Sequence, residues 1–302
     1  MIPIIIGSRG SPLALAQSRL VMGELKKAWP ARNFEIHAIK TEGDKRSELT
    51  TTGSMTPLGE GLFVAELEKA LLAGEIHLAV HSLKDMPTTS TEGLMIAAVP
   101  KRADARDVII TRGADLDEEL PPGAVVATGS PRRVEQLLQV RHDLVTEEIH
   151  GNVDTRLKRF RENKNWSGLI LAAAGLARLK PDLAGLTVTP LPFEQMLPAP
   201  GQGALAVQSR MEHSADERQL VRVLHDPVTE AAVKAERMFL HALGGGCQEP
   251  IGAYAEVSSD DMLVLEGIAW LFGEANPRRG HLTRRMDQAE KLGVDLAVEL
   301  SR

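Results

Sequence analysis

Short apolar runs alternate with stretches of helical spacing from the first residues of the chain onward. The runs are short, as in buried strands, and the stretches between them repeat apolar positions every three or four residues. The elements expected in this part are a strand at 4–7, a helix from 11 to about 29, a strand at 34–40, a helix from about 62 to 73 and a strand at 77–80. This alternation predicts a mainly parallel, doubly wound sheet.

A second alternation begins after a polar and charged stretch at 100–107. It predicts strands at 108–111 and 125–128, followed by a helix from 131. Prolines and glycines between 190 and 203 then precede a strand-like run at 204–208, where we expect the chain to return to the first sheet. The last part predicts a long helix from about 226 to 242, strands at 251–257 and 263–270, and a final helix.

These changes of pattern predict an α/β fold with two doubly wound domains and a small C-terminal α+β domain. The chain has 302 residues, which suits two or three domains at roughly 100 to 200 residues each. We expect a discontinuous first domain at 1–99 and 200–222, a second at 104–194 and a C-terminal domain at 224–302.

Composition narrows the class of protein. The net charge is −6, so we expect no nucleic-acid partner, and any anion site has to be local. The single cysteine excludes an internal disulfide framework and a cysteine zinc cluster, and it fits a reducing compartment such as the cytoplasm. We expect no export signal, no membrane helix of ~20 apolar residues and no metal site.

The segment 41–60 has little periodicity and contains three glycines, Gly43, Gly53 and Gly59. Loops of this length inside compact domains are uncommon and tend to be functional. A disordered surface insertion explains the composition equally well, so both interpretations stay open.

Two turns share one design. Each follows a predicted strand and places a serine before a proline, Ser11 in the first turn and Ser130 in the second, with arginine close by at Arg9, Arg132 and Arg133. Backbone N–H groups at a helix start, together with the helix dipole and arginine, can bind carboxylate or phosphate. Helix capping alone also explains each turn.

Lys84 and Asp85 belong to the polar cluster at 81–87 that follows the predicted strand at 77–80. Side chains at the carboxyl end of such a strand are placed for catalysis, and a carboxylate there can stabilise a cationic intermediate or move a proton. An ordinary turn before Pro87 is the alternative. Arg156 and Arg178 are further candidate cations, although solvated helix faces would also accommodate them.

Cys247 follows three glycines, Gly244, Gly245 and Gly246. Glycines remove side chains around the sulfur, as expected where a bulky group approaches closely, so a covalent attachment site or a nucleophile is credible. Most lone cysteines are instead small buried apolar residues.

Taken together, these segments resemble the porphobilinogen deaminase family over nearly the whole chain. Six motifs occur in the family's order: SRGSPLALAQ at 8–17, AVHSLKDMP at 79–87, TGSPRR at 128–133, GNVDTRL at 151–157, LPAPGQGA at 197–204 and GGGCQEPIG at 244–252. The resemblance implies two periplasmic-binding-protein-like domains around a cleft, with a smaller C-terminal domain. It also implies the condensation of four porphobilinogen molecules, with loss of ammonia and release of hydroxymethylbilane.

The resemblance assigns roles to particular residues. It implies a dipyrromethane cofactor joined through a thioether to Cys247, with Asp85 as the catalytic residue that contacts the pyrrole nitrogens. The further residues that match cofactor contacts are Lys84, Ser130, Arg132, Arg133 and Arg156. Those that match substrate contacts are Arg9, Ser11, His150, Arg156, Arg178 and Gln202. We expect a monomer whose partner is the small molecule porphobilinogen.

Two positions depart from the family pattern. Glu60 stands where a lysine is usual, and His150 stands where an arginine usually precedes Gly-Asn-Val. A histidine at a carboxylate site would make binding depend on pH.

Two other functions remain open from the residues alone. A non-catalytic binding protein built from two α/β halves would capture a small anion, but it would need neither Asp85 nor Cys247. A cysteine hydrolase would need a histidine beside Cys247, and none of the nine histidines lies in a recognisable partner motif.

Overall fold

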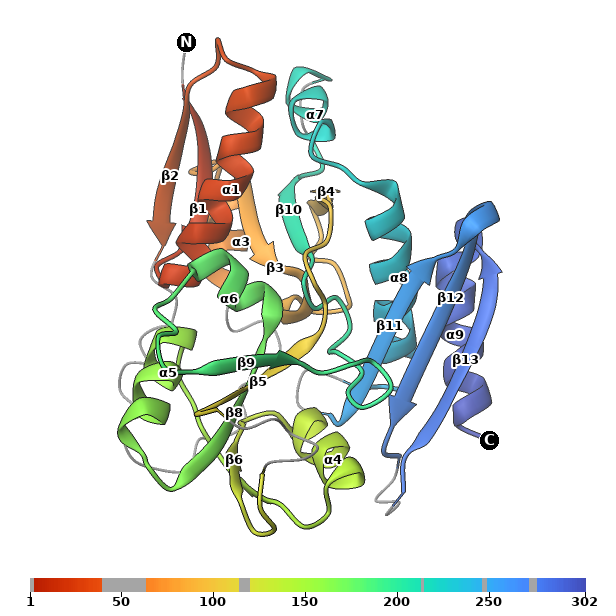
Figure 1. Ribbon diagram of the computed structural model, residues 1–302. Helices are drawn as coiled ribbons and strands as arrows, with labels where there is room; N and C mark the ends of the chain where they lie inside the picture. The colour runs from red at the N-terminus through yellow and green to blue at the C-terminus, as the bar shows by residue number, and fades with distance from the viewer. Residues whose placement is uncertain (1–2, 40–63, 114–119, 213–214, 246–248, 272–275) are drawn as a thin grey trace.

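The computed structural model describes residues 3–39, 64–113, 120–212, 215–245, 249–271 and 276–302. In these residues the strands form two five-stranded sheets and one three-stranded sheet (Figure 1). One of the larger sheets takes its strands from the red-to-orange part of the chain and from the teal β10, the other lies in the yellow-to-green part, and the third lies in the blue C-terminal part.

The first sheet has the strand order β2-β1-β3-β10-β4. Its strands are β1 (Ile4–Arg9), β2 (Phe34–Ile39), β3 (Leu78–Ser82), β4 (Leu94–Ala98) and β10 (Leu205–Arg210). Helices α1 (Pro12–Ala28) and α7 (Ala215–Arg222) share one hydrophobic cluster with Ile6 and Val80, whereas α3 (Ala65–Leu72) shares another with Ala79. Because neighbouring strand residues point to opposite faces, both faces of this sheet are covered.

The second sheet repeats this plan with the order β7-β6-β8-β5-β9. Its strands are β5 (Asp107–Thr111), β6 (Val125–Ala127), β7 (Val145–Glu147), β8 (Trp166–Ala172) and β9 (Thr187–Pro190). Helices α5 (Val153–Glu162) and α6 (Ala173–Leu179) pack in one cluster around Phe160, and α4 (Pro131–Val140) packs in another through Leu137. The prediction of two doubly wound α/β units is therefore confirmed.

The prediction that the sheets are mainly parallel is confirmed for four of the five strands in each sheet. Each sheet contains one strand that runs antiparallel to both of its neighbours, β10 in the first and β5 in the second. The first residue of each of these strands pairs with the last residue of a neighbour: Leu205 with Ser82, and Asp107 with Ala172. The chain thus crosses twice between the carboxyl ends of the other strands and has to enter each sheet in the reverse direction. The predicted return to the first sheet through β10 is confirmed.

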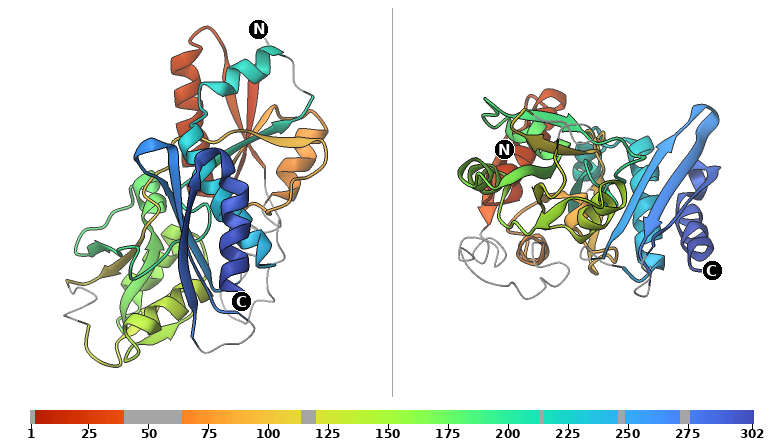
Figure 2. Two further views of the ribbon diagram at one scale, coloured as in Figure 1. Left: turned by 90° about the vertical axis from the view of Figure 1, so that its right-hand side faces the viewer. Right: turned by 60° about the horizontal axis from the view of Figure 1, so that its bottom comes forward.

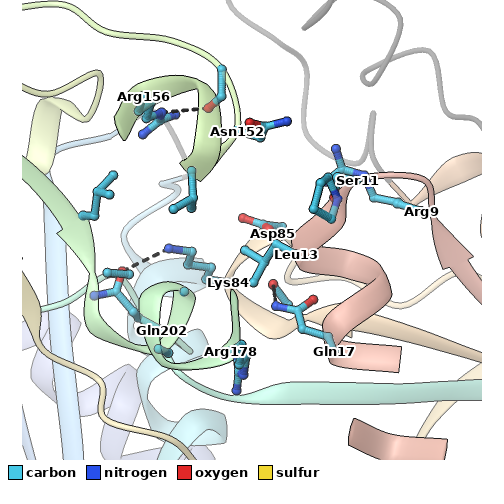
Figure 3. Close-up of a pocket in the computed structure, with 18 of the residues that line it drawn as sticks. Arg9, Ser11, Leu13, Gln17, Lys84, Asp85, Asn152, Arg156, Arg178 and Gln202 are labelled. Atoms are coloured by element: carbon cyan, nitrogen blue, oxygen red, sulfur yellow. Dashed lines mark hydrogen bonds between the residues drawn. The ribbon is translucent and has the colours of Figure 1, made fainter. Parts of the chain in front are cut away.

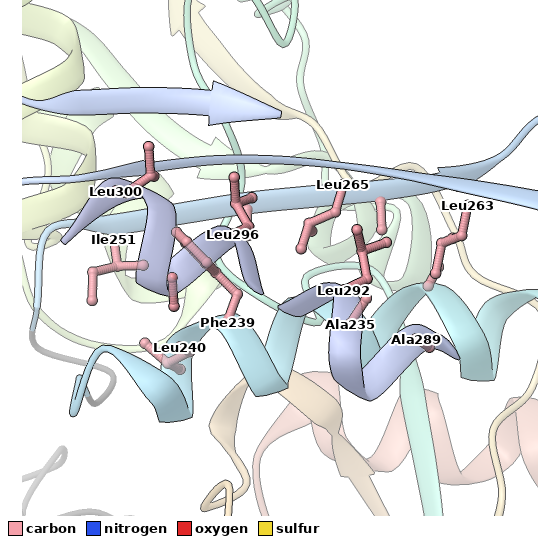
Figure 4. Close-up of a cluster of buried hydrophobic side chains, with 14 of the residues drawn as sticks. Ala235, Phe239, Leu240, Ile251, Leu263, Leu265, Ala289, Leu292, Leu296 and Leu300 are labelled. Atoms are coloured by element: carbon pink, nitrogen blue, oxygen red, sulfur yellow. The ribbon is translucent and has the colours of Figure 1, made fainter. Parts of the chain in front are cut away.

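The C-terminal part is a small α+β unit. Strands β11 (Ile251–Val257), β12 (Met262–Ala269) and β13 (Arg278–Arg285) form an antiparallel sheet, against which α8 (Pro227–Ala242) and α9 (Ala289–Leu300) pack. Phe239 lies at the centre of the shared core with Leu265 and Leu296 (Figure 4). The sequence pattern missed β13, because its exposed positions carry polar residues, Arg279, His281, Thr283 and Arg285, and only Leu282 interrupts its polar character.

A buried carboxylate joins this unit to both crossings between the larger sheets. Glu236 of α8 is fully buried and forms a bidentate ion pair with Arg102, at 2.6 and 3.0 Å. The same carboxylate accepts hydrogen bonds from the backbone N–H of Gly201, at 2.7 Å, and of Ala255, at 2.8 Å. Arg102 belongs to the first crossing and Gly201 to the second, and Figure 2 shows the C-terminal part lying alongside both larger units.

Candidate functional site

A cavity of about 620 Å³ lies between the carboxyl ends of the strands of the two larger sheets. Its wall combines residues from β1 and α1, the turn after β3, the start of α5, α6 and the second crossing (Figure 3). The sequence-predicted site residues that line it are Arg9, Ser11, Lys84, Asp85, Arg133, Arg156, Arg178 and Gln202. Seven residues from five separate sequence motifs, together with Arg178, therefore meet in one cavity.

The wall from the first sheet starts at the end of β1. Ser11 is the N-cap of α1, because its hydroxyl accepts a hydrogen bond from the backbone N–H of Ala14 at 3.3 Å, and Pro12 begins the helix. One turn further on, the buried Gln17 donates to the hydroxyl of Ser82 at 2.8 Å. This bond fixes α1 against the end of β3, so Arg9, Ser11 and Gln17 face the cavity as one surface.

Lys84 and Asp85 lie on a short 3-10 turn (Leu83–Asp85) that follows β3 directly. The backbone N–H of Leu83 donates to the carbonyl of Ala204, at 3.1 Å, which ties the turn to the second crossing. On its other side Arg237 of α8 donates to three carbonyls of the same segment, those of Leu83, Met86 and Pro87. The backbone that carries Asp85 is therefore held from two directions.

Behind this turn, His81 is buried and its Nε2 lies 3.1 Å from Oε1 of Gln208. Burial lowers the pKa of His81 to about 4, despite that hydrogen bond. His81 is therefore neutral near pH 7 and adds no positive charge to the cavity.

Lys84 is connected to the second sheet through Gln202. Its Nζ donates to Oε1 of Gln202 at 3.1 Å, and Nε2 of Gln202 donates to Asp107 at 2.8 Å. Burial lowers the pKa of Lys84 to about 8, although the neighbouring Asp85 opposes the shift. Lys84 is therefore mostly a cation at neutral pH.

Arg132 and Arg133 are adjacent in sequence but differ in exposure to the cavity. Both pair with the buried carboxylate of Asp107, at 2.8 Å from Arg132 and 2.7 Å from Arg133. Burial by itself raises the pKa of Asp107, but the charges of the two arginines outweigh it and hold that pKa well below its usual range. Arg133 lines the cavity, whereas Arg132 lies outside its wall and donates to the carbonyl of Leu197.

The opposite wall comes from α5 and α6. Asn152 caps α5 by accepting from the N–H of Thr155 at 2.9 Å, so the positive end of this helix faces the cavity. Arg156 donates to the carbonyl of Gly151 at 2.7 Å, and Arg178 donates to that of Gly203 at 2.6 Å. Burial lowers the pKa of each arginine to about 10, and both stay charged at neutral pH.

Besides Arg132, two further sequence-predicted residues lie outside the wall. Ser130 begins α4, but its side chain makes no capping hydrogen bond, and it does not line the cavity. His150 also lies outside the wall, and its Nε2 is 2.7 Å from a carboxylate oxygen of the exposed Glu148. Of the predicted anion-binding turn formed by Ser130, Arg132 and Arg133, only Arg133 therefore lines the cavity.

Three predictions concern positions beyond the described residues. Cys247, Glu60 and the segment 41–60 all lie in the ranges that the structure leaves undescribed. The roles expected for them remain predictions.

The site residues that sequence reasoning missed include Gln17, Asn152 and Arg159 in the wall, and Asp107 behind it. Asp107 begins an apolar strand, DVIIT, and a charged residue in such a run was a usable signal of a buried ion pair. Arg159 follows Arg156 by three positions on α5, which places the two on one face of the helix. Gln17 and Asn152 carry no comparable signal, since amides are common on helices and at caps.

The charges of this wall favour an anionic ligand. Six described lining residues are basic, Arg9, Lys84, Arg133, Arg156, Arg159 and Arg178, and Asp85 is the acidic one. Such a surface suits a ligand with several carboxylates, and the carboxylate of Asp85 among these cations suits a ligand that also develops positive charge.

The described residues contain no group of three or more His, Cys, Asp or Glu side chains arranged to hold a metal ion. Within the same residues, no helix combines the length and apolarity that crossing a bilayer requires.

Comparisons with known proteins agree over nearly the whole chain. The family profile for the dipyromethane cofactor binding domain of porphobilinogen deaminase matches residues 4–218, and the profile for the C-terminal domain of the same enzyme matches 231–302. A porphobilinogen deaminase of Thermus thermophilus is 46% identical over 98% of this chain and 95% of its own length.

Further relatives carry the same description. A porphobilinogen deaminase of Geobacillus kaustophilus is 48% identical over 88% of this chain and 84% of its own length. One of Chlorobium chlorochromatii is 42% identical over 98% of this chain and 94% of its own length. Among solved structures, the effector binding domain of a BenM variant has a TM-score of 0.42 at 12% identity, covering 81% of this chain and 97% of that one.

Proposed function

The chain belongs to the porphobilinogen deaminase family, and from this membership we propose how its cavity carries out the reaction. The enzyme links four porphobilinogen molecules head to tail with loss of ammonia, and then releases hydroxymethylbilane by hydrolysis for tetrapyrrole biosynthesis. The observation that supports this most directly is that, among the described lining residues, Asp85 is the single carboxylate and six are basic. Each pyrrole carries an acetate and a propionate, so a growing chain accumulates carboxylates that such a wall can bind.

The residues present fit the dipyrromethane cofactor that the family carries. Lys84, Arg133 and Arg156 line the cavity and would hold its carboxylates, and Cys247 would bind it through a thioether. When bound, the cofactor supplies a nucleophilic pyrrole carbon as primer. Arg132 and Ser130 lie outside the wall, so we propose that Arg132 acts by holding Asp107 and thereby orienting Arg133.

Asp85 has the central chemical role. Loss of ammonia from porphobilinogen leaves positive charge on the pyrrole, and a carboxylate within reach of the pyrrole N–H stabilises that charge. Arg9, Ser11 and Arg178 bind the side-chain carboxylates of the incoming substrate, and they lie on both walls (Figure 3). Gln202 acts indirectly, because it is fully buried and its amide positions Lys84.

We also propose the domain bounds 1–99 with 200–222, 104–194 and 224–302, which the three separate sheets support. The protein works as a cytoplasmic monomer without a nucleic-acid partner. A net charge of −6 and a cavity built from one chain support this proposal.

The first experiment tests the covalent cofactor. Ehrlich's reagent should react with the purified protein, and intact-protein mass spectrometry should show one dipyrromethane added to the bare chain. Cys247→Ser should return the mass to that of the bare chain and abolish turnover. An anion-binding protein or a cysteine hydrolase would carry no pyrrole, so an active protein of unmodified mass would exclude the proposal.

The second experiment tests Asp85. Asp85→Asn keeps the shape and removes the charge, so turnover should fall by about 10² or more, as when a central electrostatic group is lost. Cofactor content, read with Ehrlich's reagent, separates a loss of chemistry from a loss of assembly. Near-normal turnover in a cofactor-loaded variant would refute this role.

A further inference from the structure

Position 150 does not supply the cation that the family pattern places there. An arginine usually precedes Gly-Asn-Val, and this chain has His150. The imidazole pairs with Glu148, whose side chain is 69% exposed, at 2.7 Å. His150 is not among the described residues that line the cavity, and its side chain is 34% exposed.

A different residue brings positive charge to the same place. Arg159 of α5 lines the cavity beside Arg156, and its Nη1 donates to the backbone carbonyl of His150 at 3.2 Å. Its charge adds to the lowering of the pKa of Arg156, after the larger effects of burial and Arg133. The guanidinium of Arg159 therefore lies next to both the backbone of residue 150 and the cavity.

The other cations of α5 have different surroundings. Lys158 is 76% exposed and lies 3.9 Å from Glu162 one turn away. Arg161 donates to the carbonyls of Asp182 and Ala184, on the side of α5 that faces the loop after α6. Arg156 and Arg159, three positions apart, are the two cations that α5 presents to the cavity.

We infer that Arg159 binds a substrate carboxylate and replaces the cation that the family pattern places at position 150. This inference rests on the proposed function. A guanidinium can bind a carboxylate through two parallel N–H···O bonds, and the bond to the carbonyl of His150 orients it. The positive charge thus comes from the helix instead of the turn before it.

The test compares Arg159→Gln with Lys158→Gln, which removes a neighbouring cation of the same helix outside the cavity. We expect Arg159→Gln to raise KM for porphobilinogen by about 10-fold or more, as for a lost bond between charged groups, with a much smaller change in kcat. Lys158→Gln should leave KM near the wild-type value. Equal KM values in the two variants would overturn the inference.

A second arm uses rescue. In Arg159→Gln, the added change His150→Arg restores the family's own arrangement and should bring KM back towards the wild-type value. If the double variant had a KM as high as that of Arg159→Gln, the inference that Arg159 replaces the cation of position 150 would be disproved. If Arg159→Gln folds poorly, two other variants replace it in the comparison. Arg159→Lys keeps the charge, so it should bind porphobilinogen better than an Arg159→Met variant of equal thermal stability.

Reaction with Ehrlich's reagent and the thermal midpoint are measured for every variant. Wild-type protein without a pyrrole or turnover would mean that the proposed function has failed. Loaded, active variants with an unchanged KM would mean that only the role of Arg159 has failed.

Discussion

At the scale of single residues, backbone carbonyls and amide side chains hold the cations of the cavity in place. Arg156 donates to the carbonyl of Gly151, Arg178 to that of Gly203, and Lys84 to the side chain of Gln202. These neutral acceptors orient the guanidinium groups of Arg156 and Arg178 and the ammonium group of Lys84 at the cavity. Arg133 differs, because it shares the carboxylate of Asp107 with Arg132.

Lys84 should make substrate binding depend on pH. Because burial lowers its pKa to about 8, the cation is present at lower pH and is lost as the pH rises through that value. We expect kcat/KM for porphobilinogen to fall above about pH 8 by up to about tenfold, since one charge-assisted bond becomes neutral. In Lys84→Arg the charge persists, so this fall should be absent.

The measurement is kcat/KM between pH 6 and 9.5 for both proteins. The ratio of the two profiles removes the titration of the substrate itself. A ratio that stays constant with pH would contradict the role given to Lys84.

At the scale of elements, α8 supports the turn that carries the catalytic carboxylate. Val233 packs in one cluster with Leu83 and Met86, and Arg237, four residues later, donates to the carbonyls of that turn. His241, four residues further on, lies 3.2 Å from the hydroxyl of Thr88. One face of α8 thus follows the whole segment from the 3-10 turn to residue 88, and the same helix ends five residues before Cys247 in the sequence.

Removing Arg237 should impair chemistry more than binding. Arg237→Met leaves three carbonyls without their donor and lets the turn shift, so we expect kcat to fall by about 10-fold or more with a smaller change in KM. Lys234→Met is the matched control, because Lys234 is 51% exposed and pairs with Glu290. The experiment measures kcat, KM, thermal midpoint and Ehrlich reaction for both variants. If kcat fell only in proportion to the lost cofactor, this result would argue against a role of Arg237 in positioning the turn.

At the scale of the whole molecule, the C-terminal unit is attached to the two crossings through charged and aromatic contacts. Glu236 pairs with Arg102 of the first crossing and accepts from Gly201 of the second. Phe193 of the second crossing stacks on Tyr254 of β11, with ring centroids 3.9 Å apart. The unit therefore holds the segments between the two larger sheets as well as the helix that leads to Cys247.

Glu236→Ala should weaken this attachment. The substitution leaves Arg102, 11% exposed, without its carboxylate, so we expect a loss of about 3–5 kcal/mol in the free energy of unfolding. Glu230→Ala is the control, because that side chain is 49% exposed on the same helix.

The three tryptophans allow the units to be followed separately. Trp29 ends α1, Trp166 begins β8 and Trp270 follows β12, so proteins with a single tryptophan each report one unit during urea unfolding. In Glu236→Ala, we expect the unfolding transition reported by Trp270 to occur at a lower urea concentration than the transitions reported by Trp29 and Trp166. Three coincident transitions at the wild-type midpoint would show that Glu236 does not join the units.

The sequence by itself determined the alternation of strands and helices, the helix starts at Ser11 and Asp226, the family and eight of the residues that line the cavity. These depend on local periodicity, on capping and on motifs that are continuous in the chain. The direction of β5 and β10 was not accessible in this way, because it depends on where the chain crosses between sheets.

Only the tertiary structure decided which of several candidate cations line the cavity. Arg133 lines it and its neighbour Arg132 does not, because Asp107 and the carbonyl of Leu197 hold Arg132 behind the wall. Arg159 lines it and His150 does not, because Glu148 binds the imidazole outside. A side chain's direction depends on partners far away in the sequence, whereas a motif records only which residue stands at each position.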